Sequence, residues 1–170
     1  MVDVAAVLAE AFDRVRDGVH GALDGVAEEA LTWRADPEAN TMAWLAWHLT
    51  RVQDDHVADV ASHGQVWVVG GFMTRFALPL DELDTGWGHD AEQVGRVRAG
   101  RELLLEYYDA VHEQTLRFVR GLSAADLDWV VDTRWDPPVT LGVRLVSVLE
   151  DDVQHVGQLG YVRGLYERRG

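Results

Sequence analysis

The chain has 170 residues, a formal net charge of -14 at pH 7 and a pI near 4.7, and it contains no cysteine. The lack of cysteine excludes disulfides, thiolate nucleophiles of the protein's own and cysteine-type zinc sites, so a metal site must use His, Asp, Glu or backbone oxygen. The acidic charge argues against nucleic acid as a partner, because binding a phosphate backbone depends on a basic surface that releases counterions.

The start of the chain does not look like a signal peptide, because acidic residues occur within its first dozen positions and no continuous apolar run follows. No apolar stretch approaches the roughly 20 residues of a membrane span. We therefore expect a cytoplasmic protein without membrane partners. Its length suits one domain over residues 1–170 that buries roughly two thirds of the surface of the unfolded chain.

The first two helices are predicted by apolar residues that recur at spacings of three and four. The first such stretch covers residues 3–29. After a loop that contains a proline, either Asn40 or Thr41 is a suitable N-cap for the second helix. We expect this second helix to end near His63 or Gly64.

A long crossover is predicted for residues 64–90, which are rich in glycine and aromatic residues and show no helical period. The segment exceeds the usual length of a connection between helices, and long connections often carry functional residues. The third helix should follow it, beginning near Ala91 or Val97 and ending near Val119.

The last helix is expected from about Thr140 to about Tyr166, after a short capped turn and a segment whose prolines exclude helix. Four long amphipathic helices with one long crossover between the second and the third indicate an all-α four-helix bundle.

The core-facing side of the last helix contains two ionisable residues where apolar residues are expected. The members of this side are Leu145, Val148, Asp152, His155, Leu159, Val162 and Tyr166. Burying such groups without partners costs several kcal/mol, so we interpret them as candidate ligands. Asp151 precedes His155 by four residues and Asp152 precedes it by three; spacing alone does not choose between the two carboxylates.

On the second helix, His48 lies at the edge of the apolar stripe. Asp55 is seven residues away, roughly 10 Å along the helix axis, so these two cannot bind the same ion. Together with a carboxylate and a histidine from the last helix, His48 would complete a set of three N/O ligands with positions left for water or substrate, as in catalytic zinc sites. The alternative is that His48 is an ordinary hydrogen-bonded core histidine.

The remaining histidines are expected to have structural roles. We expect His20, His63 and His112 at surface or loop positions, whereas His56 and His89 could line a pocket. Four tryptophans could form the apolar walls of a substrate pocket, although core packing is the simpler interpretation of each; they are Trp44, Trp47, Trp67 and Trp87.

Three segments carry a resemblance to a known family: "NTMAWLAWHLTRVQDDH", "DTGWGHDAEQV" and "EDDVQHVGQLGYVRG". They resemble the DinB-like (YfiT-like) metalloenzymes, in the branch related to mycothiol-dependent maleylpyruvate isomerase and to mycothiol or bacillithiol S-transferases. The resemblance implies a four-helix bundle and a divalent ion, usually zinc or nickel. Carried over, the ligands fall on His48, Asp151 and His155, which favours Asp151 over Asp152.

The resemblance also implies the function, which is metal-dependent transfer of a low-molecular-weight thiol, with mycothiol expected, to a small electrophile. A bound ion would lower the pKa of the thiol, so that a protein without cysteine could use thiolate chemistry. Many relatives have His at the position of Asp151 and the isomerases have Glu. Because the isomerases have a further C-terminal domain and this sequence ends soon after its last helix, maleylpyruvate isomerisation is not expected.

Two alternatives to the transferase are kept open. One is a metal-dependent hydrolase in which the same ion activates water. The other is a non-catalytic metal-binding protein of the stress response. Members of the family are often dimers, and the apolar stripe of the first helix is long enough to serve both the core and an interface, so we expect a homodimer.

Overall fold

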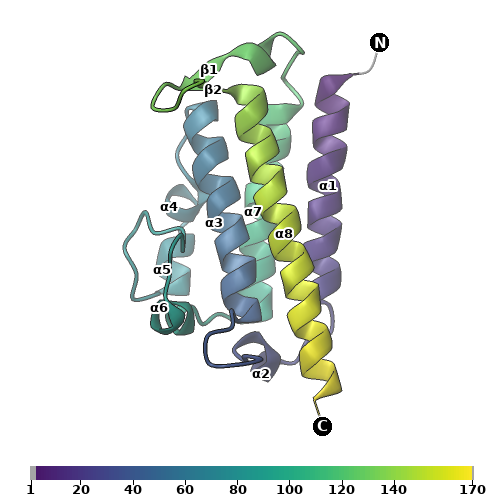
Figure 1. The fold of residues 1–170 in the computed structure, drawn as a ribbon, viewed down its shortest axis with the longest axis vertical. Helices are drawn as coiled ribbons and strands as arrows, with labels where there is room; N and C mark the ends of the chain where they lie inside the picture. The colour runs from purple at the N-terminus through teal and green to yellow at the C-terminus, as the bar shows by residue number, and fades with distance from the viewer. Residues whose placement is uncertain (1–2, 170) are drawn as a thin grey trace.

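The computed structural model describes residues 3–169, in which the chain forms four long helices and seven short elements (Figure 1). The long helices are α1 (Val4–Leu23), α3 (Met42–Ala61), α7 (Arg101–Val119) and α8 (Leu141–Arg168). The expected all-α four-helix bundle is confirmed. No helix of the described part combines the length and apolar character that crossing a bilayer requires.

The four long helices form a closed ring in which α3 packs against α7 and α8, and α1 packs against the other sides of the same two helices. Figure 1 shows that the neighbours α3 and α7 run in the same direction, whereas α3 and α8 are antiparallel. The chain must therefore return along the bundle between α3 and α7. This is the physical reason for the long crossover.

The crossover contains short helices that the sequence analysis did not predict. These are α4 (Val66–Val69) and α5 (Phe72–Phe76). A helix does begin at Ala91, as one of the two expected starts of the third helix, but it forms the separate α6 (Ala91–Arg96), and α7 begins at Arg101. The expectation of an irregular segment over residues 64–90 was wrong at α4 and α5, because helices of four or five residues are too short to show a 3.6-residue period.

The caps explain where the long helices begin. The side chains of Asp3, Thr41 and Thr140 accept hydrogen bonds from the backbone of the first turns of α1, α3 and α8. The predicted first helix was too long: α1 ends at Leu23, and the short helix α2 (Glu28–Leu31) follows. Gly25, with φ +64°, breaks the helix. Apolar spacing continues past the break because the loop residue Val26 also packs in the core.

A small hairpin covers one end of the bundle (Figure 1). It consists of β1 (Val130–Asp132) and β2 (Val139–Thr140), which are antiparallel, and the 3-10 turn η1 (Asp126–Asp128) precedes it. The prolines before α8 exclude a helix in this segment, as expected, but strands of two or three residues leave too little pattern to be predicted.

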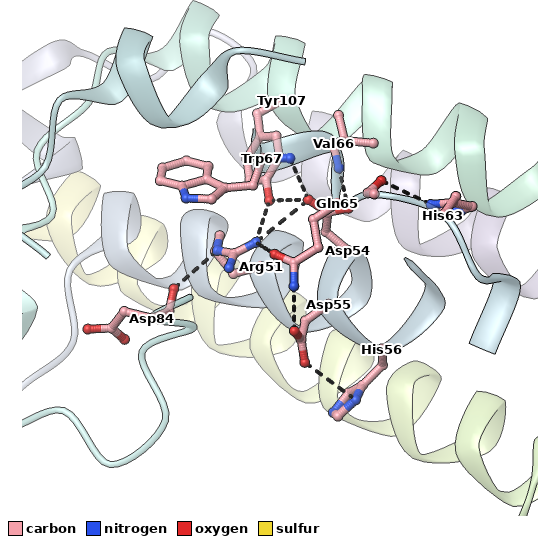
Figure 2. A network of polar contacts seen from close by, with 11 residues as sticks. Arg51, Asp54, Asp55, His56, His63, Gln65, Val66, Trp67, Asp84 and Tyr107 are labelled. Atoms are coloured by element: carbon pink, nitrogen blue, oxygen red, sulfur yellow. Dashed lines mark hydrogen bonds and ion pairs between the residues drawn. The ribbon is translucent and has the colours of Figure 1, made fainter. Parts of the chain in front are cut away.

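The crossover is attached to α3 by a buried polar network, shown in Figure 2. Arg51 is fully buried and donates hydrogen bonds to Gln65 Oε1 (2.9 Å) and to the Tyr107 hydroxyl (3.3 Å). The Asp54 carboxylate accepts hydrogen bonds from the Tyr107 hydroxyl (2.8 Å) and from the backbone N–H groups of Val66 (2.8 Å) and Trp67 (2.7 Å). These contacts hold the first turn of α4 against α3.

We predict that Asp54→Ala lowers the free energy of unfolding by about 3 kcal/mol, because it leaves two buried N–H groups, a buried hydroxyl and the charge of Arg51 without their acceptor. Chemical denaturation measures the change. The exposed Asp59, on the same helix, is the matched control, and Asp59→Ala should change stability by less than about 0.5 kcal/mol. Equal small effects would show that the network does not stabilise the crossover.

Candidate metal centre

Three ionisable side chains converge between the antiparallel helices α3 and α8. His48 from α3, and Asp151 and His155 from α8, each bring one potential ligand atom to within 4.8 Å of the others. Asp151 Oδ1 lies 3.6 Å from His155 Nε2, and the two imidazole rings stand edge to face with centroids 4.7 Å apart. Ligand atoms of a tetrahedral zinc ion lie about 3.4 Å apart, so this set could hold such an ion.

Both histidines present the same nitrogen to the centre. His48 Nδ1 lies 2.5 Å from the carbonyl oxygen of Thr85, and His155 Nδ1 lies 3.1 Å from Gln158 Oε1. Because both partners are carbonyl oxygens that can only accept, each Nδ1 carries a hydrogen, and in the neutral ring each Nε2 keeps its lone pair. Hydrogen bonds of this kind fix the tautomer and the ring orientation of histidine ligands in metal sites.

The crossover approaches His48 so closely that only glycine fits at position 86. Gly86 has φ +91°, and an added Cβ would lie 2.9 Å from His48 Nδ1 and 2.9 Å from the Trp47 ring. The Asp84 carboxylate accepts a hydrogen bond from the Gly86 backbone N–H (2.7 Å), which stabilises the turn. The loop therefore brings the carbonyl of Thr85 onto the ring of His48.

The same loop is anchored by His89 and Arg51. Trp44 Nε1 donates a hydrogen bond to His89 Nδ1 (3.1 Å), so His89 donates from Nε2 to the Asp84 carboxylate, which lies 3.0 Å away. Arg51 Nε donates to the Asp84 carbonyl (3.1 Å). The Trp44 ring also stacks on the His48 ring, with centroids 4.5 Å apart. His48 is thus held from two sides.

Sequence reasoning missed most of these supporting residues. Thr85, Gly86 and Asp84 belong to the "DTGWGHD" segment, whose closely spaced glycines and histidine were the available signal. Gln158 belongs to the last-helix motif but was not assigned a role. Arg51 is buried and lies 33 residues from Asp84 in the sequence. No local sequence pattern indicates a contact over such a separation.

The electrostatics of the two histidines differ. Burial lowers the pKa of His48, and the nearby His155 also lowers it, against the opposing effects of Thr85 and Asp151. Burial acts to lower the pKa of His155 as well, but the Asp151 carboxylate, 3.6 Å from Nε2, outweighs it and raises the pKa. A divalent cation beside Asp151 would compete with this proton, as metal ions do at histidine ligands.

The two neighbouring aspartates of α8 have different surroundings. Asp151 is partly exposed, lies beside the two histidines and is a member of the converging group. Asp152 is fully buried and lies outside that group, and its carboxylate forms no hydrogen bond with any residue between positions 3 and 169. Burial raises the pKa of Asp152 well above its usual range, and the charge of Asp151 adds to this effect.

A cavity of about 380 Å³ adjoins the three converging residues. Its lining residues are His48, Val52, Asp55, His56, Thr85, Trp87 and Asp151. Trp87 is 87 % exposed, whereas Trp44, Trp47 and Trp67 are buried in the core. Of the four tryptophans, only Trp87 lines this cavity.

The other histidines are placed largely as expected, with one correction. His112 was expected at the surface but is buried, because it faces α1 and bonds Asp13 at 2.9 Å. His20 and His63 are partly exposed, and His56 lines the cavity described above.

Comparisons with known proteins agree with this fold. A family model described as Mycothiol-S-transferase matches residues 7–168. A crystal structure of a conserved protein from Enterococcus faecalis superposes with a TM-score of 0.88 and 30 % sequence identity, over 96 % of each chain. No curated protein sequence matches. The bundle is of the DinB/YfiT-like superfamily, and the chain belongs to the mycothiol S-transferase family.

Asp152 generates a prediction about pH. In the unfolded chain Asp152 ionises near pH 3.9, whereas burial raises its pKa in the folded protein. The unfolded state therefore loses the proton first as pH rises, and the group destabilises the fold increasingly above about pH 4. We expect Asp152→Asn to raise the free energy of unfolding of chelator-treated protein by about 1–3 kcal/mol at pH 7 and by much less at pH 4.

Thermal or chemical unfolding at the two pH values measures this difference. Asp59→Asn, at an exposed position of α3, serves as the control and should change neither value appreciably. A loss of stability in Asp152→Asn at pH 7, or a gain that is larger at pH 4, would contradict this description of the carboxyl group.

Proposed function

We propose that this protein is a divalent-metal-dependent thiol S-transferase whose ion, zinc or nickel, is held by His48, Asp151 and His155. The observation that supports the proposal most strongly is the convergence of these three side chains, with both histidines presenting Nε2. Three protein ligands would leave coordination positions open, which distinguishes a catalytic from a closed structural site. The adjoining cavity offers room for a substrate at that position.

Because the chain has no cysteine, the sulfur nucleophile must come from the co-substrate and not from the protein. A bound divalent ion lowers the pKa of a thiol ligand and stabilises its thiolate near neutral pH. The protein's own residues hold the ion and orient its ligands, while the sulfur nucleophile comes with the co-substrate. In the transfer, the thiol gives up its proton, its sulfur bonds to the electrophilic carbon, and the leaving group departs with the bonding electron pair.

We propose mycothiol as the thiol, on the basis of family membership, and a small electrophile as the acceptor. Trp87 would form one apolar wall for that electrophile, because it borders the cavity beside His48. We place the reaction in the cytoplasm, where low-molecular-weight thiols are kept reduced.

A homodimer is part of the proposal, although the surface involved differs from the one expected. Most of the apolar stripe of α1 is buried within the bundle, so it is not free to form an interface. Large apolar side chains are exposed instead along the outer face of α8, at Val143, Val146, Val153 and Tyr161. We propose that a second copy of the chain covers this face.

The metal site is tested by binding stoichiometry. We expect about one equivalent of zinc or nickel per chain by elemental analysis and calorimetric titration, and loss of that binding in His48→Ala and His155→Ala. Asp151→Asn should weaken binding at least tenfold, in the range typical of lost ligands or their direct supports. Asp152→Asn should change it little.

His63→Ala is the matched control, because His63 is a partly exposed histidine at the end of α3 outside the converging group. It should bind the ion as the wild type does. Binding of less than one equivalent by the wild type would refute the site. Equal weakening in Asp151→Asn and Asp152→Asn would show that the choice of carboxylate is wrong.

The transferase proposal is tested with cobalt-substituted protein. If the open position accepts a thiolate, adding mycothiol should produce an intense near-ultraviolet sulfur-to-cobalt charge-transfer band and should release a proton. The band should be absent in His48→Ala, which lacks a ligand. An unchanged spectrum at millimolar mycothiol, cysteine and glutathione would refute thiol transfer and favour a hydrolase or a catalytically silent site.

A further inference from the structure

His56, on α3, borders three adjoining hollows that lead away from the proposed metal centre. The first, of about 380 Å³, also contains His48 and Asp151. The second, of about 370 Å³, lies at the end of α3 and shares Asp55 and His56 with the first. The third, of about 350 Å³, lies between the hairpin and α8. We call these three hollows the α3–α8 groove.

The tautomer of His56 is fixed by an arginine. Arg144 Nη1 lies 2.7 Å from His56 Nδ1, and a guanidinium can only donate, so Nδ1 accepts and Nε2 carries the hydrogen. The Asp55 carboxylate lies 3.8 Å from the same Nδ1, too far for a hydrogen bond. His56 Nε2 forms no hydrogen bond with any residue in the described range 3–169, which leaves a donor for a ligand.

Arg144 is itself held in place. Its Nη2 donates to Asp132 Oδ2 (3.2 Å), and both side chains are largely buried. Asp132 also accepts hydrogen bonds from the side chain of Arg134, at 3.0 and 2.8 Å. The hairpin therefore supports Arg144, and Arg144 in turn supports the ring of His56.

Burial and the charge of Arg144 favour the neutral form of the His56 ring. Burial lowers the pKa of His56, and the charge of Arg144 lowers it further, whereas Asp55, Asp151 and Asp59 act in the opposite direction. A neutral ring with its only hydrogen on Nε2 is a hydrogen-bond donor rather than a proton acceptor at that atom.

Distance favours the thiol over the electrophile as the ligand of this donor. His56 is eight residues from His48, which corresponds to about 12 Å along α3. A small electrophile in contact with sulfur at the metal centre would not reach that far. Mycothiol consists of a cysteine joined through an amide to a polyhydroxylated unit, so its oxygen atoms lie many bonds from the sulfur.

The lining of the second hollow also suits such a ligand. Beyond His56, the second hollow is bordered mainly by charged and hydrogen-bonding side chains, among them Asp59, Gln65, Arg134 and Arg144. Such groups suit hydroxyl and amide partners better than an apolar electrophile.

We propose that the second hollow of the α3–α8 groove binds the polar, oxygen-rich end of the thiol co-substrate, and that His56 donates its Nε2–H to one of the oxygen atoms of that end. This inference rests on the proposed function, which places the sulfur of the thiol co-substrate at the metal centre and so fixes the other end of that molecule. His56 is a specificity-determining residue that distinguishes a thiol with a hydroxylated extension from a simple alkyl thiol.

The tautomer can be tested without any activity measurement. Long-range ¹H–¹⁵N NMR correlations of ¹⁵N-histidine-labelled protein, assigned with His56→Gln, should show the hydrogen of His56 on Nε2. In Arg144→Met, which removes the donor to Nδ1, both tautomers should be populated. Finding the hydrogen on Nδ1 in the wild type would overturn the inference.

The ligand is tested by thiol binding to cobalt-substituted protein, with mycothiol and propanethiol as probes. His56→Leu should raise the Kd for mycothiol about three- to tenfold, the equivalent of one hydrogen bond, and leave the Kd for propanethiol unchanged. His56→Gln, which keeps an N–H donor, should restore mycothiol binding to within about twofold. His20→Leu, at a histidine of α1 outside the groove, is the matched control.

The outcomes separate this inference from the proposed function. If neither thiol gives a cobalt band, the transferase proposal fails and the inference fails with it. If the band forms but His56→Leu binds mycothiol as the wild type does, the metal centre stands and the groove assignment is overturned. Equal weakening of both thiols would place the effect at the metal centre and would likewise overturn the assignment.

Discussion

The parallel arrangement of α3 and α7 is the constraint on which the rest of this structure depends. Two neighbouring helices that run the same way cannot be joined by a tight turn, so the chain must return along the bundle. The returning segment needs attachment, and the buried Arg51 and Asp54 provide it through hydrogen bonds to the crossover. The crossover then brings Thr85 and Gly86 against His48.

The candidate centre is therefore built from long-range contacts around a local motif. One turn of α8 supplies Asp151 and His155, while His48 comes from the antiparallel neighbour α3. The crossover orients His48 from behind, so the ring exposes Nε2 to the two residues of α8. The converging group offers nitrogen and oxygen atoms as candidate ligands, and the chain has no thiol of its own, which is consistent with a family named for transfer of a small-molecule thiol.

Much of the bundle could be predicted from the sequence, because helices of about twenty residues show a clear apolar period and recognisable caps such as Thr41 and Thr140. Asp152 and His155 break the apolar seam of α8, and this break indicated the helix that contributes two of the three converging residues. Spacing alone could not separate Asp151 from Asp152. That separation depends on tertiary packing, which buries one carboxylate and leaves the other beside His48. The short helices α4 and α5, the hairpin and the Arg144–His56 contact are determined by packing between distant segments, which no local pattern records.

The central claim is that His48, Asp151 and His155 hold one divalent ion with a position left open. The most direct measurement is a crystal structure of the zinc-loaded protein with anomalous diffraction data collected on both sides of the zinc absorption edge. This account predicts one anomalous peak per chain, about 2.0–2.2 Å from Nε2 of both histidines and from an oxygen of Asp151, with at least one non-protein ligand facing the cavity. A peak elsewhere, or an ion bound by Asp152 in place of Asp151, would contradict it.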